Sequence, residues 1–159
     1  MSLKSYRIAG IVTVFVALAA LISAYALQDF AGLYPCPLCL LERWPYRVVV
    51  LLGLAAALAG GMPGRVLLGL AAVALLGDAA IGFVHVGVEF HWWLSPLPEC
   101  NGRILPGAPL QAMPAKPCDE PTYLIPHLPV SLAMLNFIYA TVSALALLGY
   151  VVASPRRTS

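Results

Sequence analysis

Four long apolar segments constrain the fold of this chain more than any other feature. They cover residues 8–27, 45–61, 66–88 and 130–153. Because about 20 apolar residues cross a bilayer as a helix, each segment has roughly the length of one span. Only 10% of the 159 residues are charged, whereas a soluble domain carries roughly 25%. We therefore predict an all-α membrane protein, a single domain folded as a four-helix transmembrane bundle.

The first segment also resembles a secretory signal, since Lys4 and Arg7 precede it and Ala24-Tyr25-Ala26 has the form of a cleavage site. A signal core usually spans about 7–15 apolar residues. The run here is longer, so we expect a retained helix.

Charged residues predict the orientation of the bundle. Five basic residues fall on one side of the predicted membrane: Lys4, Arg7, Arg65, Arg156 and Arg157. Six of the seven acids fall on the other side or at its border: Asp29, Glu42, Glu89, Glu99, Asp119 and Glu120. Since cytoplasmic loops are enriched in basic residues, we expect both termini in the cytoplasm and periplasmic loops at about 28–44 and 87–129. The net charge of +2 gives no indication of nucleic-acid binding.

All four cysteines then lie on the exported side, where disulfides are permitted, and their even number fits two pairs. They are Cys36, Cys39, Cys100 and Cys118. The loop that holds the last two contains nine of the fourteen prolines. Because proline fixes φ and lacks a backbone donor, this loop is predicted to be a mobile, partly extended arm.

The stretch Pro35-Cys-Pro-Leu-Cys-Leu-Leu-Glu-Arg43 predicts the start of a helix. Pro37 suits the first helical position, which would make Cys36 the cap and place Cys39 in the first turn. At about 100° per residue, Cys36, Cys39 and Arg43 lie within roughly an 80° sector of one face. Pro45 is expected to end or kink this turn.

That arrangement indicates redox chemistry, because a helix N-terminus and a nearby cation lower a thiol's pKa from about 8.5 toward as little as 3.5. Arg43 is a cation that keeps its proton. A structural disulfide between Cys36 and Cys39 is the first alternative, but it would close a very small loop. A zinc site formed by the four cysteines is the second, but seventeen residues separate the last two, whereas zinc sites usually use two close pairs.

Cys100 and Cys118 could form a structural disulfide or one that takes part in thiol–disulfide exchange. Beside a redox dithiol, a disulfide on an exposed arm would be accessible to an incoming thiolate. Electrons reaching Cys36 and Cys39 then need an acceptor, and the sequence has no haem, dinucleotide or flavin motif. A lipid-soluble quinone fits, with Arg43 donating to a carbonyl oxygen.

These motifs resemble those of the DsbB family, the bacterial inner-membrane proteins that generate disulfides. The resemblance covers nearly the whole chain, and its specific part is the Cys-x-x-Cys-Leu-Leu-Glu-Arg block at 36–43. The segment Ser95-Pro-Leu-Pro-Glu99 before Cys100 supports it. The spacing from Cys100 to Cys118 is shorter than in the best-known members.

The resemblance implies a role for each cysteine. A reduced DsbA-like thioredoxin-fold oxidase would attack Cys100 in its disulfide with Cys118, and the stretch 96–101 would lie in that partner's groove. Cys118 would then attack the inner pair at Cys36, and Cys39 would be left as the thiolate that engages ubiquinone or menaquinone from the membrane pool. Arg43 would hold and polarise the quinone.

Two other functions remain open from the residues alone. One is a non-catalytic membrane assembly factor with two structural disulfides. The other is a vitamin K epoxide reductase-like enzyme, although in that family the loop cysteines precede the membrane-proximal pair.

Three further ionisable residues lie in or near the third segment. Asp78 falls near mid-membrane, with His85 and Glu89 at helical spacing beyond it. An acid paired inside the bundle is favoured over a proton route to the quinone. His91 and His127 show no metal-ligand spacing, and no metal site is expected.

Overall fold

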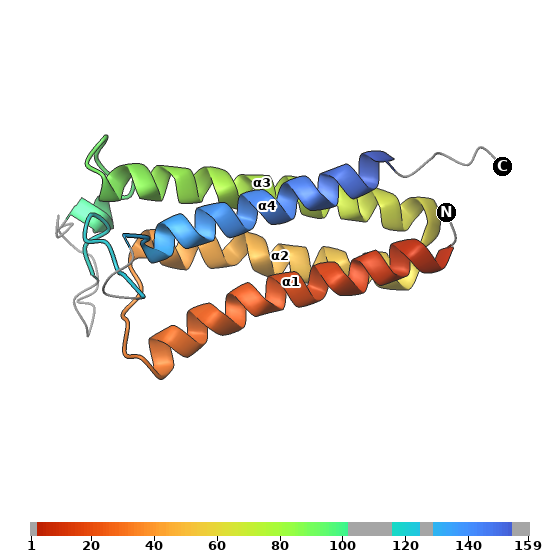
Figure 1. Ribbon diagram of the computed structural model, residues 1–159, viewed down its shortest axis with the longest axis horizontal. Helices are drawn as coiled ribbons and strands as arrows, with labels where there is room; N and C mark the ends of the chain where they lie inside the picture. The colour runs from red at the N-terminus through yellow and green to blue at the C-terminus, as the bar shows by residue number, and fades with distance from the viewer. Residues whose placement is uncertain (1–2, 102–115, 125–128, 154–159) are drawn as a thin grey trace.

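The computed structural model describes residues 3–101, 116–124 and 129–153. Four helices run antiparallel to their chain neighbours along one long axis (Figure 1). They are α1 (Leu3–Asp29), α2 (Pro37–Ala59), α3 (Gly61–Glu89) and α4 (Leu132–Ala153). A short 3-10 helix, η1 (Pro98–Asn101), follows α3, and Tyr123 forms an isolated β-bridge with Ser131. The predicted all-α class is confirmed for the described residues, and 102–115 of the proline-rich loop lie outside them.

Three helices are suited to a bilayer. α1, α3 and α4 are each long and apolar enough to cross a membrane. Their outward faces carry large apolar side chains such as Phe15, Val73 and Leu145, each more than half exposed. Such surfaces are unfavourable in water and well solvated by lipid. In contrast, α2 carries Glu42, Arg43 and Arg47 in its first half, and its crossing stays a prediction.

α2 starts earlier than the apolar pattern indicated. Its helix begins at Pro37, and Pro45 lies inside it. The expectation that Pro45 ends the turn begun at Pro37 is therefore wrong, whereas a kink at Pro45 stays a prediction. A proline inside a helix removes one backbone donor and crowds the preceding turn, yet α2 continues through Pro45 and packs against both α1 and α3.

Close packing joins α1 to α2 at the end of the bundle that holds the α2–α3 turn. A Cβ atom added at Gly10 would lie 2.6 Å from the backbone nitrogen of Ala57, and one at Gly53 would lie 3.1 Å from the carbonyl oxygen of Gly10. Small residues permit this approach of two helix backbones. The turn itself uses Gly60 and Gly61, with φ angles of 60° and 54°, a region that favours glycine.

The cysteine-bearing segments lie at the opposite end of the bundle. The start of α1, the end of α4 and the α2–α3 turn share one end, and η1 and the segment 116–124 lie at the other (Figure 1). Between them a core of Ala17, Tyr46, Val49 and Leu75 holds the helices together. Toward Asp29, α1 diverges from the other helices (Figure 1).

Candidate functional site

The inner cysteine pair forms the first turn of α2. Cys36 is the N-cap with an extended backbone, Pro37 follows it at the start of the helix, and the Cys36 Sγ accepts a hydrogen bond from the Cys39 backbone N–H at 3.1 Å. The two Sγ atoms lie 2.6 Å apart, and both cysteines are free. The predicted cap is confirmed. A small side-chain rotation would suffice to form or open a disulfide here.

Hydrogen bonding divides the two thiols into unequal partners. The hydrogen bond from the Cys39 thiol lowers the pKa of the Cys36 thiol, and the backbone N–H of Cys39 lowers it further, against the opposing effect of burial. The same thiol contact, together with burial, raises the pKa of Cys39. The Cys36 thiol therefore loses its proton more readily than the Cys39 thiol does.

The outer cysteines form a disulfide that packs against the inner pair. Cys100 in η1 is bonded to Cys118. Both residues are buried in one cluster with Cys36, Leu38 and Val88. The prediction of an exposed disulfide is thus wrong for this conformation, because these apolar neighbours cover it. An incoming thiol can reach Cys100 only after the covering residues move.

A histidine and a carboxylate complete the surroundings of Cys36. The His85 Nε2 atom of α3 lies 3.5 Å from the Cys36 Sγ, and its Nδ1 atom lies 2.8 Å from Glu42 Oε1 of α2. Both residues are buried. The carboxylate favours the tautomer with hydrogen on Nδ1, which leaves the Nε2 lone pair directed at the sulfur. The chain Cys36–His85–Glu42 can accept or return the proton of the thiol.

Arg43 contacts two residues of α1. Its Nη1 atom donates to Gln28 Oε1 at 2.9 Å, and its guanidinium lies 4.6 Å from the ring centroid of Tyr25, so the group is held toward α1. The leading causes of the lowered Cys36 pKa come from Cys39. Arg43 nevertheless lines the same cavity as both inner cysteines.

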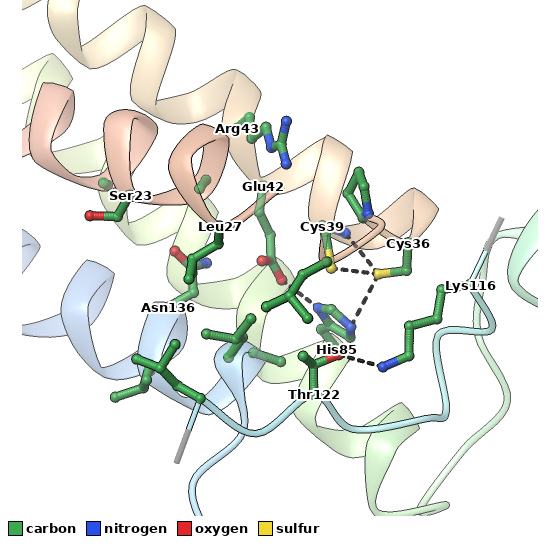
Figure 2. Close-up of a pocket in the computed structure, with 18 of the residues that line it drawn as sticks. Ser23, Leu27, Cys36, Cys39, Glu42, Arg43, His85, Lys116, Thr122 and Asn136 are labelled. Atoms are coloured by element: carbon green, nitrogen blue, oxygen red, sulfur yellow. Dashed lines mark hydrogen bonds and ion pairs between the residues drawn. The ribbon is translucent and has the colours of Figure 1, made fainter. Parts of the chain in front are cut away.

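A cavity of about 390 Å³ lies where α1 diverges from α2 and α4. Figure 2 shows Cys36, Cys39 and His85 near one another on its wall, with Lys116 and Thr122 of the segment 116–124 close by. Lys116 Nζ donates to Thr122 Oγ1. Most of the remaining wall is apolar and comes from α1 and α4: Ala20, Ala24, Leu27, Leu132, Ala133 and Leu135. A mostly apolar wall with polar and ionisable side chains, among them Glu42, Arg43 and His85, is compatible with a small-molecule site.

A buried polar chain leads from this cavity into the bundle. Tyr46 donates to Asn136 Oδ1 at 2.9 Å, and Asn136 Nδ2 donates to Asp78 Oδ2 at 3.1 Å. Tyr46 and Asn136 line the cavity, whereas Asp78 is fully buried. Asp78 Oδ1 has no hydrogen-bond partner among the described residues. The acid is thus paired inside the bundle, as favoured from the sequence.

The structure brings together four of the five predicted site residues around one cluster and places the fifth on the shared cavity. Cys36, Cys39, Cys100 and Cys118 adjoin one another. Sequence reasoning did not connect His85 with Cys36, because 49 positions separate them and no spacing rule links two helices. Glu42 belongs to the Cys-x-x-Cys-Leu-Leu-Glu-Arg block, but its hydrogen bond to His85 could be recognised only from the fold.

Comparisons with known proteins agree with this geometry. The chain matches the family described as "Disulfide bond formation protein DsbB" over residues 6–150. It is 33% identical to a "Disulfide bond formation protein B" of Herminiimonas arsenicoxydans over 79 residues, about half of each chain. It is 25% identical to "Uncharacterized protein RP370" of Rickettsia prowazekii (strain Madrid E), across 95% of this chain and 90% of that one. No solved structure matches. Since the family match covers nearly the whole chain, the protein belongs to the DsbB family of disulfide bond formation membrane proteins.

Proposed function

We propose that the protein is a protein-dithiol:quinone oxidoreductase that reoxidises a periplasmic DsbA-like thioredoxin-fold oxidase. The observation that carries this proposal is the single buried cluster that joins Cys36 with Cys100 and Cys118 beside an apolar cavity. Thiol–disulfide exchange requires a thiolate to reach a disulfide sulfur directly. Adjacent cysteine pairs therefore support electron transfer from the outer pair to the inner one.

Electrons would pass from the partner to the inner cysteine pair by successive thiol–disulfide exchanges. A thiolate of the partner attacks Cys100 and breaks its bond to Cys118, and the partner's second thiolate then displaces Cys100 and leaves as the oxidised protein. The Cys118 thiolate attacks Cys36 of the oxidised inner pair and releases Cys39. Cys100 next attacks Cys118, which restores the outer disulfide and frees Cys36. Two electrons and two protons have moved from the partner to the inner dithiol.

The cavity fits ubiquinone or menaquinone as the acceptor. Its walls are mostly apolar, and its volume of about 390 Å³ lies within the range of small-molecule sites. A quinone bound there supplies an acceptor for two electrons and two protons. Arg43 would hold a carbonyl oxygen, since a guanidinium has several N–H donors in one plane. His85, held by Glu42, would take up the proton of the Cys36 thiol.

The arrangement of the helices supports a four-span topology. α2 has 23 residues, about 34 Å of helix, which is enough to cross the hydrocarbon core of a bilayer. We infer that it is the fourth span. Lys4, Arg7 and Arg65 lie near the end opposite the cysteines, which supports cytoplasmic termini and periplasmic cysteines in a bacterial inner membrane.

Quinone reduction by the purified protein tests the proposal. The wild type in detergent, mixed with quinone and a reduced thioredoxin-fold oxidase, should reduce quinone catalytically, as followed by quinone absorbance. Cys39→Ser should abolish this. Cys100→Ser should lose the reaction with the partner protein but should still reduce quinone once its inner pair is reduced chemically.

The alternative is a non-catalytic membrane assembly factor with two structural disulfides. A well-folded wild-type protein without turnover in this assay would favour that alternative. Mapping of disulfides after acid trapping, with and without quinone, provides a second test. Under the proposal, the redox state of Cys36 and Cys39 changes with quinone.

A further inference from the structure

The inner cysteines and His85 also bring three potential metal-ligating atoms close together. The Sγ atoms of Cys36 and Cys39 and a ring nitrogen of His85 all lie within 4.8 Å of one another. We propose that the reduced protein binds one zinc ion, or a similarly soft divalent cation, through these three side chains. This inference goes beyond the proposed quinone chemistry and does not require it.

The ligand set matches the coordination chemistry of zinc. Two cysteines separated by two residues form a common zinc chelate, and histidine is the usual third ligand type. With Zn–S bonds of about 2.3 Å and tetrahedral angles, the two sulfurs would separate to roughly 3.8 Å. They now lie 2.6 Å apart. The change requires rotation of the Cys39 side chain, which is only partly buried, and no change in the helix.

Glu42 provides the outer hydrogen bond that metal-binding histidines normally have. Its Oε1 atom lies 2.8 Å from His85 Nδ1. A carboxylate at this position fixes the ring and leaves the Nε2 lone pair free for a metal. The same Nε2 atom lies 3.5 Å from the Cys36 Sγ. The histidine is therefore oriented as a ligand before any ion arrives.

The charge of the ligand set and the opening of the site to the cavity also suit a divalent ion. Cys36 is 4% exposed and His85 is 3% exposed, and a lone cation at such a site would be unfavourable. Two thiolates neutralise a divalent ion, so the complex with a neutral imidazole carries no net charge. All three ligands line the cavity, which leaves the fourth position of a tetrahedral ion open to water.

Such a site exists only in one redox state. Binding releases the remaining thiol protons and forms two metal–sulfur bonds, with no electron transferred. The Cys36–Cys39 disulfide has no thiolate to offer and should not bind the ion. Conversely, a bound ion occupies both sulfurs and prevents their oxidation. The cation should therefore inhibit disulfide generation reversibly.

A metal titration of the full chain tests this inference. The protein is reduced in detergent, freed of reductant and titrated with Zn²⁺ against a chromophoric chelator. Co²⁺ serves as a spectroscopic probe through its thiolate charge-transfer band. A Cys100→Ser/Cys118→Ser background removes the outer thiols, which could also chelate the ion. We expect one ion per chain in the reduced state and at least 100-fold weaker binding after oxidation of the inner pair.

Variants distinguish a site that includes His85 and Glu42 from chelation by the two cysteines alone. His85→Ala should weaken Zn²⁺ binding at least tenfold, and Glu42→Gln should weaken it by about tenfold, as is usual for outer partners of metal ligands. His91→Ala changes an exposed histidine near the end of α3 and should have no effect. His85→Gln, which preserves more of the side-chain volume, covers the case in which His85→Ala misfolds.

Two results would overturn the inference: equal affinity in the His85 and His91 variants, or equal affinity in the reduced and oxidised proteins. The proposed quinone activity is measured separately, in a metal-free buffer with chelator. Zn²⁺ binding without quinone turnover would refute the proposed function alone. Turnover that Zn²⁺ does not inhibit, with no ion bound, would refute the metal site alone.

Discussion

The two ends of the bundle use the same helices in opposite ways. At the end with the α2–α3 turn, α1 and α2 cross with their backbones in contact at Gly10 and Gly53, and Arg7 donates to the carbonyl oxygen of Leu58 at 3.0 Å. At the cysteine end, α1 has diverged and a cavity lies between it and its neighbours.

The contact between the backbones of α1 and α2 and the residues of the candidate site therefore lie at opposite ends of the bundle. At the closed end Gly10 and Gly53 let the backbones of α1 and α2 approach closely, so its strength depends on contact between helix backbones. The open end carries several buried polar and ionisable groups, including Glu42, His85 and Cys36, together with the buried Cys100–Cys118 disulfide. Buried groups of this kind are costly in a bilayer and are typical of functional sites. Substitutions at the two ends should therefore have effects of different kinds.

The largest effect is expected at the helix crossing. Gly10→Ala should reduce the free energy of unfolding by about 2–3 kcal/mol, because its new methyl group would overlap the backbone of α2, which has little freedom to move. Gly77→Ala is the matched control, since nothing lies within 4 Å of a Cβ atom at that position. It should change stability by no more than about 0.5 kcal/mol. Denaturation in mixed detergent micelles measures both, and equal values would show that the crossing is not close-packed.

The second-largest effect on stability is expected at Asn136, which links Tyr46 to Asp78 by hydrogen bonds. Asn136→Ala leaves Tyr46 and Asp78 without the partners they have now, which should cost about 2 kcal/mol of stability. Thr141→Ala, on the same helix, removes only a bond to the carbonyl oxygen of Phe137 and should cost clearly less. The same denaturation measurement compares them. An equal loss in the two variants would contradict a structural role for this chain.

The sequence predicted the helical class and the placement of the charges because both follow from local composition. It predicted the helix start at Pro37 with Cys36 as the cap. It did not predict that this helix continues through Pro45 into the second apolar segment, since Pro45 and the charges at Glu42 and Arg43 interrupt the apolar pattern. That continuity was seen only in the fold, where α2 packs against both α1 and α3. The extent of each span within the bilayer stays a prediction.

The candidate site was only partly predictable. The cap formed by Cys36 follows from the Cys-Pro-x-Cys pattern, because the local geometry of a helix start is short-range. The hydrogen-bonded contact of His85 with Glu42 joins α3 to α2, and the burial of Cys100 depends on residues from several segments. Such long-range contacts have no signature in one sequence.

A smaller effect is expected at Arg43, which faces the open end. Arg43→Gln should raise the quinone concentration needed for half-maximal turnover by roughly tenfold, equivalent to the loss of one charged hydrogen bond. Because Arg43 is buried and donates to Gln28, the same change should also reduce the free energy of unfolding by about 1–2 kcal/mol. Arg47→Gln is the control, since Arg47 is exposed and its Nη2 atom donates to the hydroxyl of Tyr25. Steady-state kinetics at several quinone concentrations distinguish the two. Identical curves for both variants would remove Arg43 from the quinone site.

The smallest effect is a difference in acidity between two neighbouring sulfurs. In the reduced protein the pKa of Cys36 is lowered by its hydrogen bond from Cys39, and the pKa of Cys39 is raised by the same contact. Only a thiolate reacts with iodoacetamide, so a lowered pKa keeps Cys36 reactive at pH values where an ordinary cysteine is protonated. Cys39 should be modified only at higher pH.

Mass spectrometry of the alkylated peptides as a function of pH checks this order. The Cys39→Ala variant provides the control, because it removes the donating thiol. The midpoint for Cys36 alkylation should then move upward, toward that of an ordinary thiol. A Cys36 midpoint that is unchanged in this variant would mean that the Cys39 thiol is not what lowers the pKa. Since the Cys39 backbone N–H remains in the variant, any residual lowering would come from the backbone hydrogen bonds of the helix cap, acting against burial and the Glu42 carboxylate.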